Sequence, residues 1–178
     1  GDHNAAQTRP VEYLRLSVTD RCNLSCRYCR PNGESGRLSR LRILSYEEML
    51  RIVNLLVEQG IKKVRLTGGE PLLRKGLADF IACLNKIPEL QEITLTTNGL
   101  FLGRLAKDLR QAGLTRLNIS LDSLSPDVFK SITGRPALHL VWDGLEAAQQ
   151  AGFDPIKLNM VVMRGVNDHE IPAFIELA

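Results

Sequence analysis

Hydrophobic and polar residues alternate in five short segments of the chain, and stretches with a helical period separate these segments. The alternating segments are predicted to be strands over Leu14–Thr19, Val64–Thr67, Ile93–Thr97, Leu117–Leu121 and Ile156–Val162. The stretches with a helical period predict helices over Tyr46–Gln59, Leu77–Lys86, Gly103–Ala112, Pro126–Ile132, Leu138–Ala151 and Glu170–Ala178. Because each connection between strands is long enough for a helix, the pattern predicts an α/β fold with a parallel sheet.

Residues typical of helix ends support these bounds. Ser45 followed by Glu48 predicts a capping box, and Ser125 before Pro126 predicts an N-cap followed by a proline in the first turn. Three expected helices end next to a glycine, at Gly60, Gly113 and Gly152. A complete eight-fold barrel typically needs about 250 residues, so 178 residues and five βα units are too few for one.

The alternation also predicts that the two faces of the sheet differ. Parallel strands that are covered on both faces are near-continuous apolar runs, and these strands are not. Successive side chains point to opposite faces, so one face is expected to bury apolar residues and the other to form a polar floor. The residues of this polar floor are Arg15, Ser17, Thr19, Arg65, Thr67, Thr94, Thr96, Asn98, Asn118, Ser120, Asp122, Lys157 and Asn159.

Two interpretations of the polar floor stay open. In the simpler one, helices cover one face of the sheet, and the polar side chains of the other face are merely solvated. In the second one, the floor binds a ligand, because it is rich in groups suited to directed hydrogen bonds and holds the cations Arg15, Arg65 and Lys157. A concave floor with that balance is expected to attract an anion such as a phosphate chain.

Composition and charge exclude several classes of protein. Of the 178 residues, 44% are hydrophobic and 24% charged, which fits one globular domain and excludes disorder over the whole chain. The net charge of +3 is too small to indicate nucleic-acid binding by itself. No segment approaches the roughly 18 apolar residues of a membrane span, so we expect a soluble, cytoplasmic protein.

Both ends of the sequence favour a partial chain. Residues 1–10 have no structural pattern and are expected to be a disordered terminus or a tag remnant. The sequence stops within an apolar helical pattern, without the glycine or asparagine that commonly closes a helix. We therefore expect residues 11–178 to form a core domain that is truncated at its C-terminal end.

Three of the four cysteines, Cys22, Cys26 and Cys29, lie within eight residues. Disulfides do not explain this group, because an odd number leaves one thiol over and no charged-then-apolar segment opens the sequence. A structural zinc site needs a fourth protein ligand, whereas three thiolates suit a four-iron cluster with one iron open to a small molecule. Both kinds of site stay open on spacing alone. Cys83 lies in a helical pattern and is expected to be a buried small hydrophobe.

Two glycines, Gly68 and Gly69, follow the second predicted strand directly and precede Glu70 and Pro71. A glycine pair lets the backbone approach a ligand closely, or simply forms a tight turn, and the turn is the simpler interpretation. The pair lies at the carboxyl end of a strand, where α/β proteins bind ligands. The segment lacks the residues of a P-loop and the spacing of a dinucleotide-binding motif, so neither nucleotide site is indicated.

The order Cys-x3-Cys-x2-Cys, with an aromatic residue before the last cysteine, resembles the radical S-adenosylmethionine (AdoMet) enzymes. From about Val11 to the end, the chain is similar to the GTP 3′,8-cyclase family of molybdenum-cofactor biosynthesis, in the segments LRLSVTDRCNLSCRYC, VRLTGGEPLLR, LTTNG, LNISLDSL and KLNMVVMRGVND. The resemblance implies an incomplete (βα)6 barrel of the triosephosphate-isomerase type, with about five βα units present here. In the family, a C-terminal region with a second 4Fe-4S cluster follows.

The resemblance also implies a radical reaction. In that family an electron donor reduces the first 4Fe-4S cluster, and AdoMet, bound at the open iron, is cleaved to a 5′-deoxyadenosyl radical. The radical abstracts the ribose 3′-hydrogen of GTP, and the product, 3′,8-cyclo-7,8-dihydro-GTP, leads to molybdopterin. The resemblance leaves open whether the protein is a monomer or a homodimer.

Positions that match the family motifs imply three groups of site residues and assign no further catalytic residue. The cluster ligands would be Cys22, Cys26 and Cys29. The residues that contact AdoMet would be Tyr28, Gly69 and Ser120. The residues that bind GTP would be Arg15, Arg65, Thr96 and Lys157, which all belong to the polar floor.

Two departures from the family affect what the resemblance implies. Arg30 stands where the family usually has Met or Leu, and the sequence offers no physical account of it. No second cysteine triad follows, so this chain alone is expected to lack a complete GTP site. Two alternatives stay open: a radical AdoMet enzyme that modifies a peptide or protein, and a non-catalytic zinc-binding α/β module.

Overall fold

The computed structural model describes residues 10–29 and 43–177; the expectations for residues 1–9 and for Arg30 lie outside the described residues. The strands are β1 (Tyr13–Ser17), β2 (Lys63–Thr67), β3 (Glu92–Thr97), β4 (Arg116–Ser120) and β5 (Lys157–Asn159). The helices are α1 (Tyr46–Glu58), α2 (Leu77–Asn85), α3 (Leu102–Ala112), α4 (Pro126–Thr133), α5 (Leu138–Gln150) and α6 (Ile171–Leu177), with 3-10 turns η2 (Pro71–Leu73) and η3 (Asp168–Glu170). None of the described helices has the length and apolar character needed to cross a lipid bilayer.

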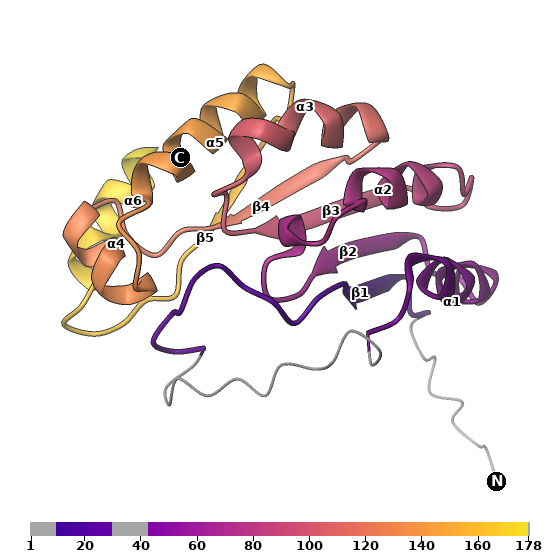
Figure 1. The fold of residues 1–178 in the computed structure, drawn as a ribbon, viewed down its shortest axis with the longest axis horizontal. Coiled ribbons are helices and arrows are strands. Elements are labelled where there is room, and N and C mark those ends of the chain that lie inside the picture. The colour runs from indigo at the N-terminus through magenta and orange to yellow at the C-terminus, as the bar shows by residue number, and fades with distance from the viewer. Residues whose placement is uncertain (1–9, 30–42, 178) are drawn as a thin grey trace, which may run out of the picture.

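The strands pair in chain order from β1 to β5, and every pair is parallel. Because such crossover connections are right-handed and the strand order never reverses, the crossover helices are expected on one face of the sheet. Figure 1 shows α1, α2, α3 and α5 along one side of the sheet, with α4 and α6 near its end. The predicted α/β fold is confirmed, and its sequential order is that of a barrel wall rather than of a doubly wound sheet.

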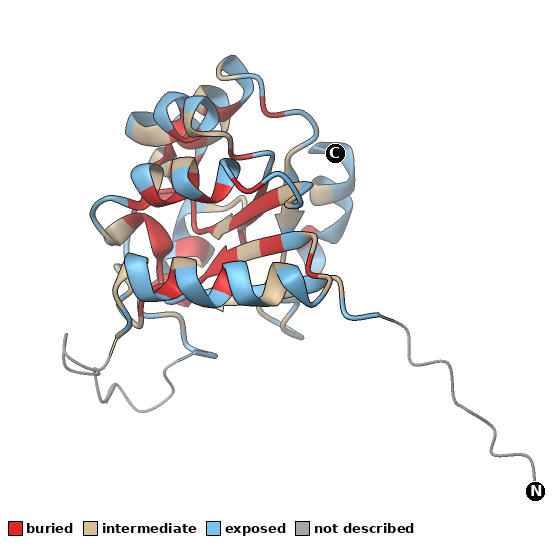
Figure 2. Cartoon of the chain, turned by 90° about the vertical axis from the view of Figure 1, so that its right-hand side faces the viewer, coloured by how far each residue is buried: buried red, intermediate tan, exposed pale blue. Residues whose placement is uncertain are grey.

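The hydrophobic core lies between the apolar face of the sheet and the helices. The strand residues that expose 1% or less of their surface include Val64, Leu66, Leu95, Leu117 and Ile119. The helices add fully or almost fully buried side chains, among them Val53, Ile81 and Leu109. Figure 2 shows buried positions in red along the strands and on parts of the helices. Burial of each such aliphatic side chain is worth about 1.5–3 kcal/mol, so this layer holds the sheet in place.

The helix ends follow the predicted signals. Ser45 Oγ accepts a hydrogen bond from Glu48 N at 3.1 Å, and Glu48 Oε2 accepts one from Ser45 N at 2.7 Å, which completes the capping box of α1. Ser125 is the N-cap of α4, with Pro126 in the first turn. Gly113 closes α3 in the left-handed conformation, with φ of 106°.

The strand predicted over Ile156–Val162 is too long, because β5 ends at Asn159. Beyond Asn159, side chains form hydrogen bonds with the backbone N–H and C=O groups that would otherwise continue the pairing of β5 with β4. Val161 N donates to Asp122 Oδ1 at 2.9 Å, and Val161 O accepts from Asn167 Nδ2 at 2.9 Å. The chain therefore leaves the sheet at a point set by the side chains of Asp122 and Asn167, of which Asp122 lies 39 residues from Val161 in the sequence.

The prediction that Cys83 is buried is wrong, because this residue is exposed on α2. The buried residues of that helix are Leu77, Phe80, Ile81 and Leu84, which occupy the i, i+3, i+4 and i+7 positions of one face. Cys83 falls beside this face rather than on it. It is a surface thiol, remote in sequence from the cysteine triad.

Candidate functional site

The register of the sheet arranges the polar floor in rows that run across the strands. Neighbouring positions on β1 to β4 form a first row of Arg15, Arg65, Thr94 and Arg116. Two residues further along, β3 to β5 form a second row of Thr96, Asn118 and Lys157. The expected single polar face is therefore confirmed, and the four residues predicted to bind GTP lie in these two rows.

Two further cations share this face and lie outside the predicted set. Lys63 precedes Arg65 by two residues, and it belongs to β2 because that strand begins one residue before its predicted start. Extending the alternation by one residue would have included it. Arg116 begins β4, and its Nε lies 3.0 Å from Glu92 Oε2, so a carboxylate already accompanies this charge.

Arg65 is held in place on the polar floor from two sides. Its guanidinium lies over the Tyr13 ring, 5.4 Å from the ring centroid. The Asn118 amide is oriented so that its nitrogen donates to Leu117 O and its oxygen accepts from Arg65. In this orientation Arg65 Nη2 donates to Asn118 Oδ1 at 3.2 Å. Arg65 Nε is buried and has no hydrogen-bond partner among the described residues. The side chain is thus oriented by a ring and an amide, and several of its five N–H donors, the buried Nε among them, make no bond to either group.

The three cysteines of the triad lie on the loop that follows β1, here called the cysteine loop (residues 19–29). None of the three forms a disulfide among the described residues, and Leu24 N donates to Cys22 Sγ at 3.5 Å. Among residues 10–29 and 43–177, no three His, Cys, Asp or Glu side chains converge on one metal ion, as the four ligands of structural zinc do. An iron–sulfur cluster takes its thiolates on separate irons, so this donor set fits a cluster better than a single zinc ion.

Burial raises the pKa of the Cys26 thiol to about 11, against the opposing effect of a hydrogen bond with Tyr28. The free thiol is therefore protonated at neutral pH. Metal ligation requires the thiolate, so iron binding at this position releases a proton. The half-buried position of Cys26 suits a thiolate best when a metal supplies the compensating positive charge.

The glycine pair after β2 lies directly against the start of the cysteine loop. Gly69 N donates to Thr19 O at 2.9 Å, and Glu70 N donates to Arg21 O at 2.6 Å. A Cβ atom on Gly69 would lie 2.2 Å from Arg21 O, and one on Gly68 would lie 2.4 Å from Thr19 O. Contact between two backbones therefore requires both glycines, independently of any ligand that they meet.

Glu70 ties this glycine turn to the carboxyl end of β3. Its side chain is buried, and its Oε1 accepts from Thr97 Oγ1 at 2.6 Å and from Leu72 N at 3.1 Å. Its Oε2 accepts from Asn98 N at 2.8 Å. Burial raises the pKa of the Glu70 carboxyl, and the three hydrogen bonds oppose this rise only in part. The acidic residue that the sequence shows beside the glycines is thus a structural bridge between two strand ends.

A Glu70→Gln variant is expected to be less stable by about 1–2 kcal/mol, because the amide nitrogen places a donor where the carboxyl accepts one. The folded-state pKa of Glu70 lies above its unfolded value, so its contribution is present below the unfolded pKa and is lost as pH rises through the folded pKa. The stability deficit of the variant should therefore narrow as the pH rises from below the ordinary carboxyl pKa through the raised pKa of Glu70. Urea unfolding measures it, with the exposed Glu58→Gln as control. A deficit that widens with pH would contradict the assignment.

The end of α4 holds the middle of the cysteine loop. Ser25 N donates to Thr133 O at 2.9 Å, and Arg27 N donates to Ile132 O at 3.1 Å. The last carbonyls of a helix have no partner within the helix. The cysteine loop therefore caps α4, and α4 in turn fixes two of the loop amides.

Asn23 and Tyr28 connect the cysteine loop to two further strand ends. Asn98, after β3, donates from Nδ2 to Asn23 Oδ1 at 2.8 Å. Tyr28 Oη donates to Asp122 Oδ2, after β4, at 2.5 Å. Burial and this hydrogen bond raise the pKa of Tyr28. The predicted AdoMet residues Tyr28, Gly69 and Ser120 thus lie on the cysteine loop and at the carboxyl ends of β2 and β4.

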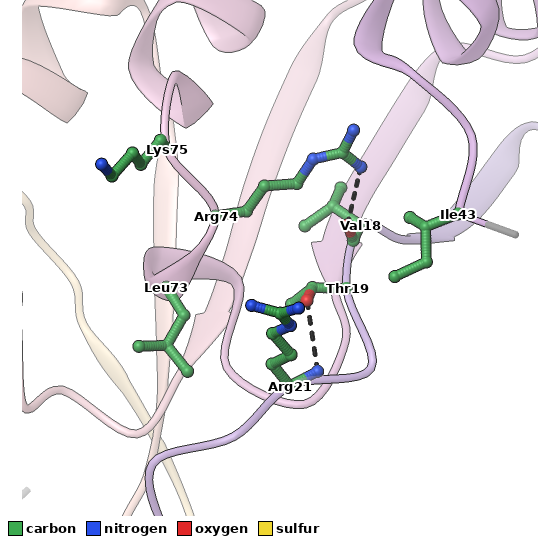
Figure 3. A pocket seen from close by; sticks show the side chains of 7 residues that line it. All are labelled: Val18, Thr19, Arg21, Ile43, Leu73, Arg74 and Lys75. Carbon is green, nitrogen blue, oxygen red and sulfur yellow. Dashed lines mark hydrogen bonds between the residues drawn. The ribbon is translucent and has the colours of Figure 1, made fainter. Parts of the chain in front are cut away.

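A cavity of about 480 Å³ lies near the carboxyl end of β1 (Figure 3). Its lining residues are Val18, Thr19, Arg21, Ile43, Leu73, Arg74 and Lys75, and none of the predicted site residues is among them. Arg74 Nη1 donates to Val18 O at 2.7 Å, and Arg74 Nη2 donates to Leu44 O at 2.8 Å. Its guanidinium also lies 4.0 Å from the centroid of the Tyr46 ring. Arg74 therefore fastens the end of β1 to the start of α1.

A cysteine triad at the carboxyl end of a sequentially ordered parallel sheet agrees with the family comparison. The model of the radical SAM superfamily matches residues 16–178. The chain belongs to the radical SAM superfamily. Members of this superfamily use a 4Fe-4S cluster and AdoMet, and the Cys-x3-Cys-x2-Cys spacing of this chain agrees with that chemistry.

Relatives within the radical SAM superfamily are similar over nearly the whole chain. The GTP 3′,8-cyclase of Geobacter sulfurreducens is 55% identical over 169 residues, and that of Petrotoga mobilis is 51% identical over 169 residues. Each match covers 95% of this chain and 52% of the relative. The chain therefore spans about half the length of the curated relatives that it matches.

Solved radical SAM structures share the fold at low sequence identity. SuiB of Streptococcus suis, bound to the precursor peptide SuiA, has a TM-score of 0.73 at 19% identity, covering 93% of this chain and 36% of SuiB. HydG, a maturase of the FeFe-hydrogenase, has a TM-score of 0.68 at 19% identity, covering 84% of this chain and 34% of HydG. These likenesses concern the fold, and they confirm the predicted incomplete barrel.

Proposed function

We propose that this chain is the AdoMet-cleaving core of a GTP 3′,8-cyclase. One observation carries the proposal: a single sheet joins a cysteine loop at the carboxyl ends of its strands to a polar floor with cations from β1 to β5. The identity of 51–55% to curated GTP 3′,8-cyclases supports the same activity. The GTP substrate and an electron donor are partners under this proposal.

In this function Cys22, Cys26 and Cys29 would each hold one iron of the cluster. When bound and reduced, the cluster supplies the electron that cleaves AdoMet to methionine and a 5′-deoxyadenosyl radical. Tyr28, Gly69 and Ser120 would border the AdoMet molecule. The anchors at Thr19, Asn23, Ser25, Arg27 and Tyr28 would keep the loop in one conformation, because together they bind the ends of β2, β3, β4 and α4.

The two rows of the polar floor would orient GTP. The row of Arg15 and Arg65 lies two residues, or about 7 Å, further from the carboxyl strand ends than the row of Thr96 and Lys157. A triphosphate bound by the two arginines would therefore direct the ribose toward the cysteine loop, where the radical forms. Lys63, on the same face as Arg65, would add charge at the phosphate end.

Anaerobic reconstitution with iron and sulfide tests the proposal. The protein is expected to bind about four irons per chain, to change its electron paramagnetic resonance spectrum when AdoMet is added, and to release 5′-deoxyadenosine. A full-length enzyme of the relatives' size that carries this sequence is expected to convert GTP to 3′,8-cyclo-7,8-dihydro-GTP. A colourless, zinc-only protein would overturn the radical reaction. Turnover with a peptide but not with GTP would favour peptide modification instead.

In the full-length enzyme, Arg65→Ala is expected to raise the Kd for GTP about 10–100-fold, because a hydrogen bond to a charged group is worth about 1.5–3 kcal/mol. Iron content and AdoMet cleavage without GTP should stay near those of the parent. Isothermal titration calorimetry measures the affinity, and Arg51→Ala, at an exposed position of α1, is the matched control. Unchanged GTP affinity in Arg65→Ala would show that the polar floor does not bind the phosphates.

A further inference from the structure

Asp122 follows β4 directly and is buried, exposing 5% of its surface. The resemblance to GTP 3′,8-cyclases assigns this residue neither to AdoMet nor to GTP. Its two carboxylate oxygens bind different segments of the site. Oδ2 accepts from Tyr28 Oη at 2.5 Å, and Oδ1 accepts from Val161 N at 2.9 Å. One buried side chain thus spans the distance between the cysteine loop and the end of β5.

The first of these bonds acts on the cysteine loop. Tyr28 lies between Cys26 and Cys29, and 40% of it is exposed, so its ring has little packing to fix its direction. The hydroxyl bond to Asp122 supplies that constraint. The bond ties this end of the loop to the sheet, whereas the anchors at Asn23, Ser25 and Arg27 hold the earlier part.

The second bond acts on β5, the strand that carries Lys157. Val161 lies two residues after the end of β5, and its amide is held by Asp122 Oδ1. The fully buried Asn167 closes the arrangement: its Nδ2 donates to Asp122 O at 2.8 Å and to Val161 O at 2.9 Å. After the last backbone hydrogen bonds between β4 and β5, the position of the chain that follows β5 therefore depends on Asp122 and Asn167.

We propose that Asp122 is a positioning residue that couples the cysteine loop to β5, so that AdoMet cleavage occurs where the substrate is held. Carboxylate oxygens accept hydrogen bonds, so the two oxygens of Asp122 can hold two different donors, Tyr28 Oη and Val161 N, at fixed places. The inference rests on the proposed function, because it assigns Tyr28 to the AdoMet side and Lys157 to the GTP side. Without Asp122 the radical still forms, but it takes its hydrogen from buffer or reductant more often than from GTP.

The first test is amide hydrogen exchange of this chain at Val161, which needs no substrate. Tyr28→Phe removes the hydroxyl that holds one carboxylate oxygen, and we expect exchange at Val161 to become about tenfold faster. Asp122→Asn keeps an acceptor for Val161 N and is expected to stay within about threefold of the parent. Asp127→Ala, at an exposed acidic residue of α4, is the control and should cause no change. An unchanged rate in Tyr28→Phe would overturn the coupling.

The second test is the ratio of 5′-deoxyadenosine to cyclised product in the full-length enzyme. Tyr28→Phe and Asp122→Ala should each raise this ratio about tenfold, and the double variant should raise it little further, because both changes break one connection. Iron content reports folding of each variant. A proportional loss of both products, or additive effects in the double variant, would overturn the coupling. Faster exchange at Val161 in a protein that never cyclises GTP would keep the coupling and refute the proposed function.

Discussion

A Cys26→Ala variant, reconstituted anaerobically with iron and sulfide, is expected to lose AdoMet cleavage by at least about a hundredfold. Cys26 is one of three thiols on the cysteine loop, and the donor set has no fourth cysteine nearby to replace it. With only Cys22 and Cys29 left, a second iron would have no protein ligand, and the loop would hold the cluster weakly or not at all. Iron analysis, visible absorption and 5′-deoxyadenosine formation measure the loss.

Cys83→Ala is the matched control for this variant. Cys83 is exposed on α2 and belongs to none of the contacts that hold the cysteine loop. Its replacement is expected to leave iron content and AdoMet cleavage unchanged. If Cys26→Ala retained its iron and its activity, or if Cys83→Ala lost both, the assignment of the cluster to the cysteine loop would be wrong.

A Gly69→Ala variant is expected to be destabilised by about 3 kcal/mol or more, the high end for a single added methyl group. The new Cβ would lie 2.2 Å from Arg21 O and 2.6 Å from Arg21 C, and both are backbone atoms that no side-chain rotation can move away. The glycine turn must therefore separate from the cysteine loop, which strains the bonds at Thr19 O and Arg21 O. For a chain of this size the loss corresponds to a melting temperature lower by about 6–12 °C.

Gly103→Ala provides the contrast for a glycine that no contact requires. Gly103 lies on helix α3, and its added Cβ would lie 3.9 Å from the nearest atom, Asp143 Cβ of α5. This variant should be stabilised by about 0.4–1 kcal/mol, since alanine restricts the unfolded chain. Thermal unfolding of both variants decides the matter. Gly69→Ala with the melting temperature of the parent would mean that the glycine pair serves only a ligand or a turn.

Alternation along the sequence predicts the sheet well, because one periodic pattern reports both the strands and the face that they bury. The polar floor follows from it directly, and the register places Arg15, Arg65 and Lys157 on one face. The same pattern misjudges the end of β5. That end depends on Asp122 and Asn167, whose side chains bind the backbone of Val161 from 39 and 6 residues away along the chain.

Local sequence also hides how the site is assembled. The cysteine spacing, together with the family resemblance, predicts a cluster, but it gives no sign that Ser25 and Arg27 cap α4. Glu70 beside two glycines looks like part of a ligand loop, whereas its partners Thr97 and Asn98 belong to the end of β3. These contacts join segments that become neighbours only when the parallel strands align. Motifs therefore identify which residues carry the chemistry, and tertiary contacts determine how firmly they are held.

The adjacent arginines of the polar floor are expected to favour anion binding but to lower the stability of the fold. Arg15 and Arg65 occupy neighbouring positions on β1 and β2, and like charges so placed repel each other. An anion bound between them turns that repulsion into attraction. Selection for thermostable variants of this protein would therefore tend to replace one of the two arginines. The selected variants would have a higher melting temperature but a lower affinity for a phosphorylated substrate. Engineering for stability is better directed at the outer helices than at this pair.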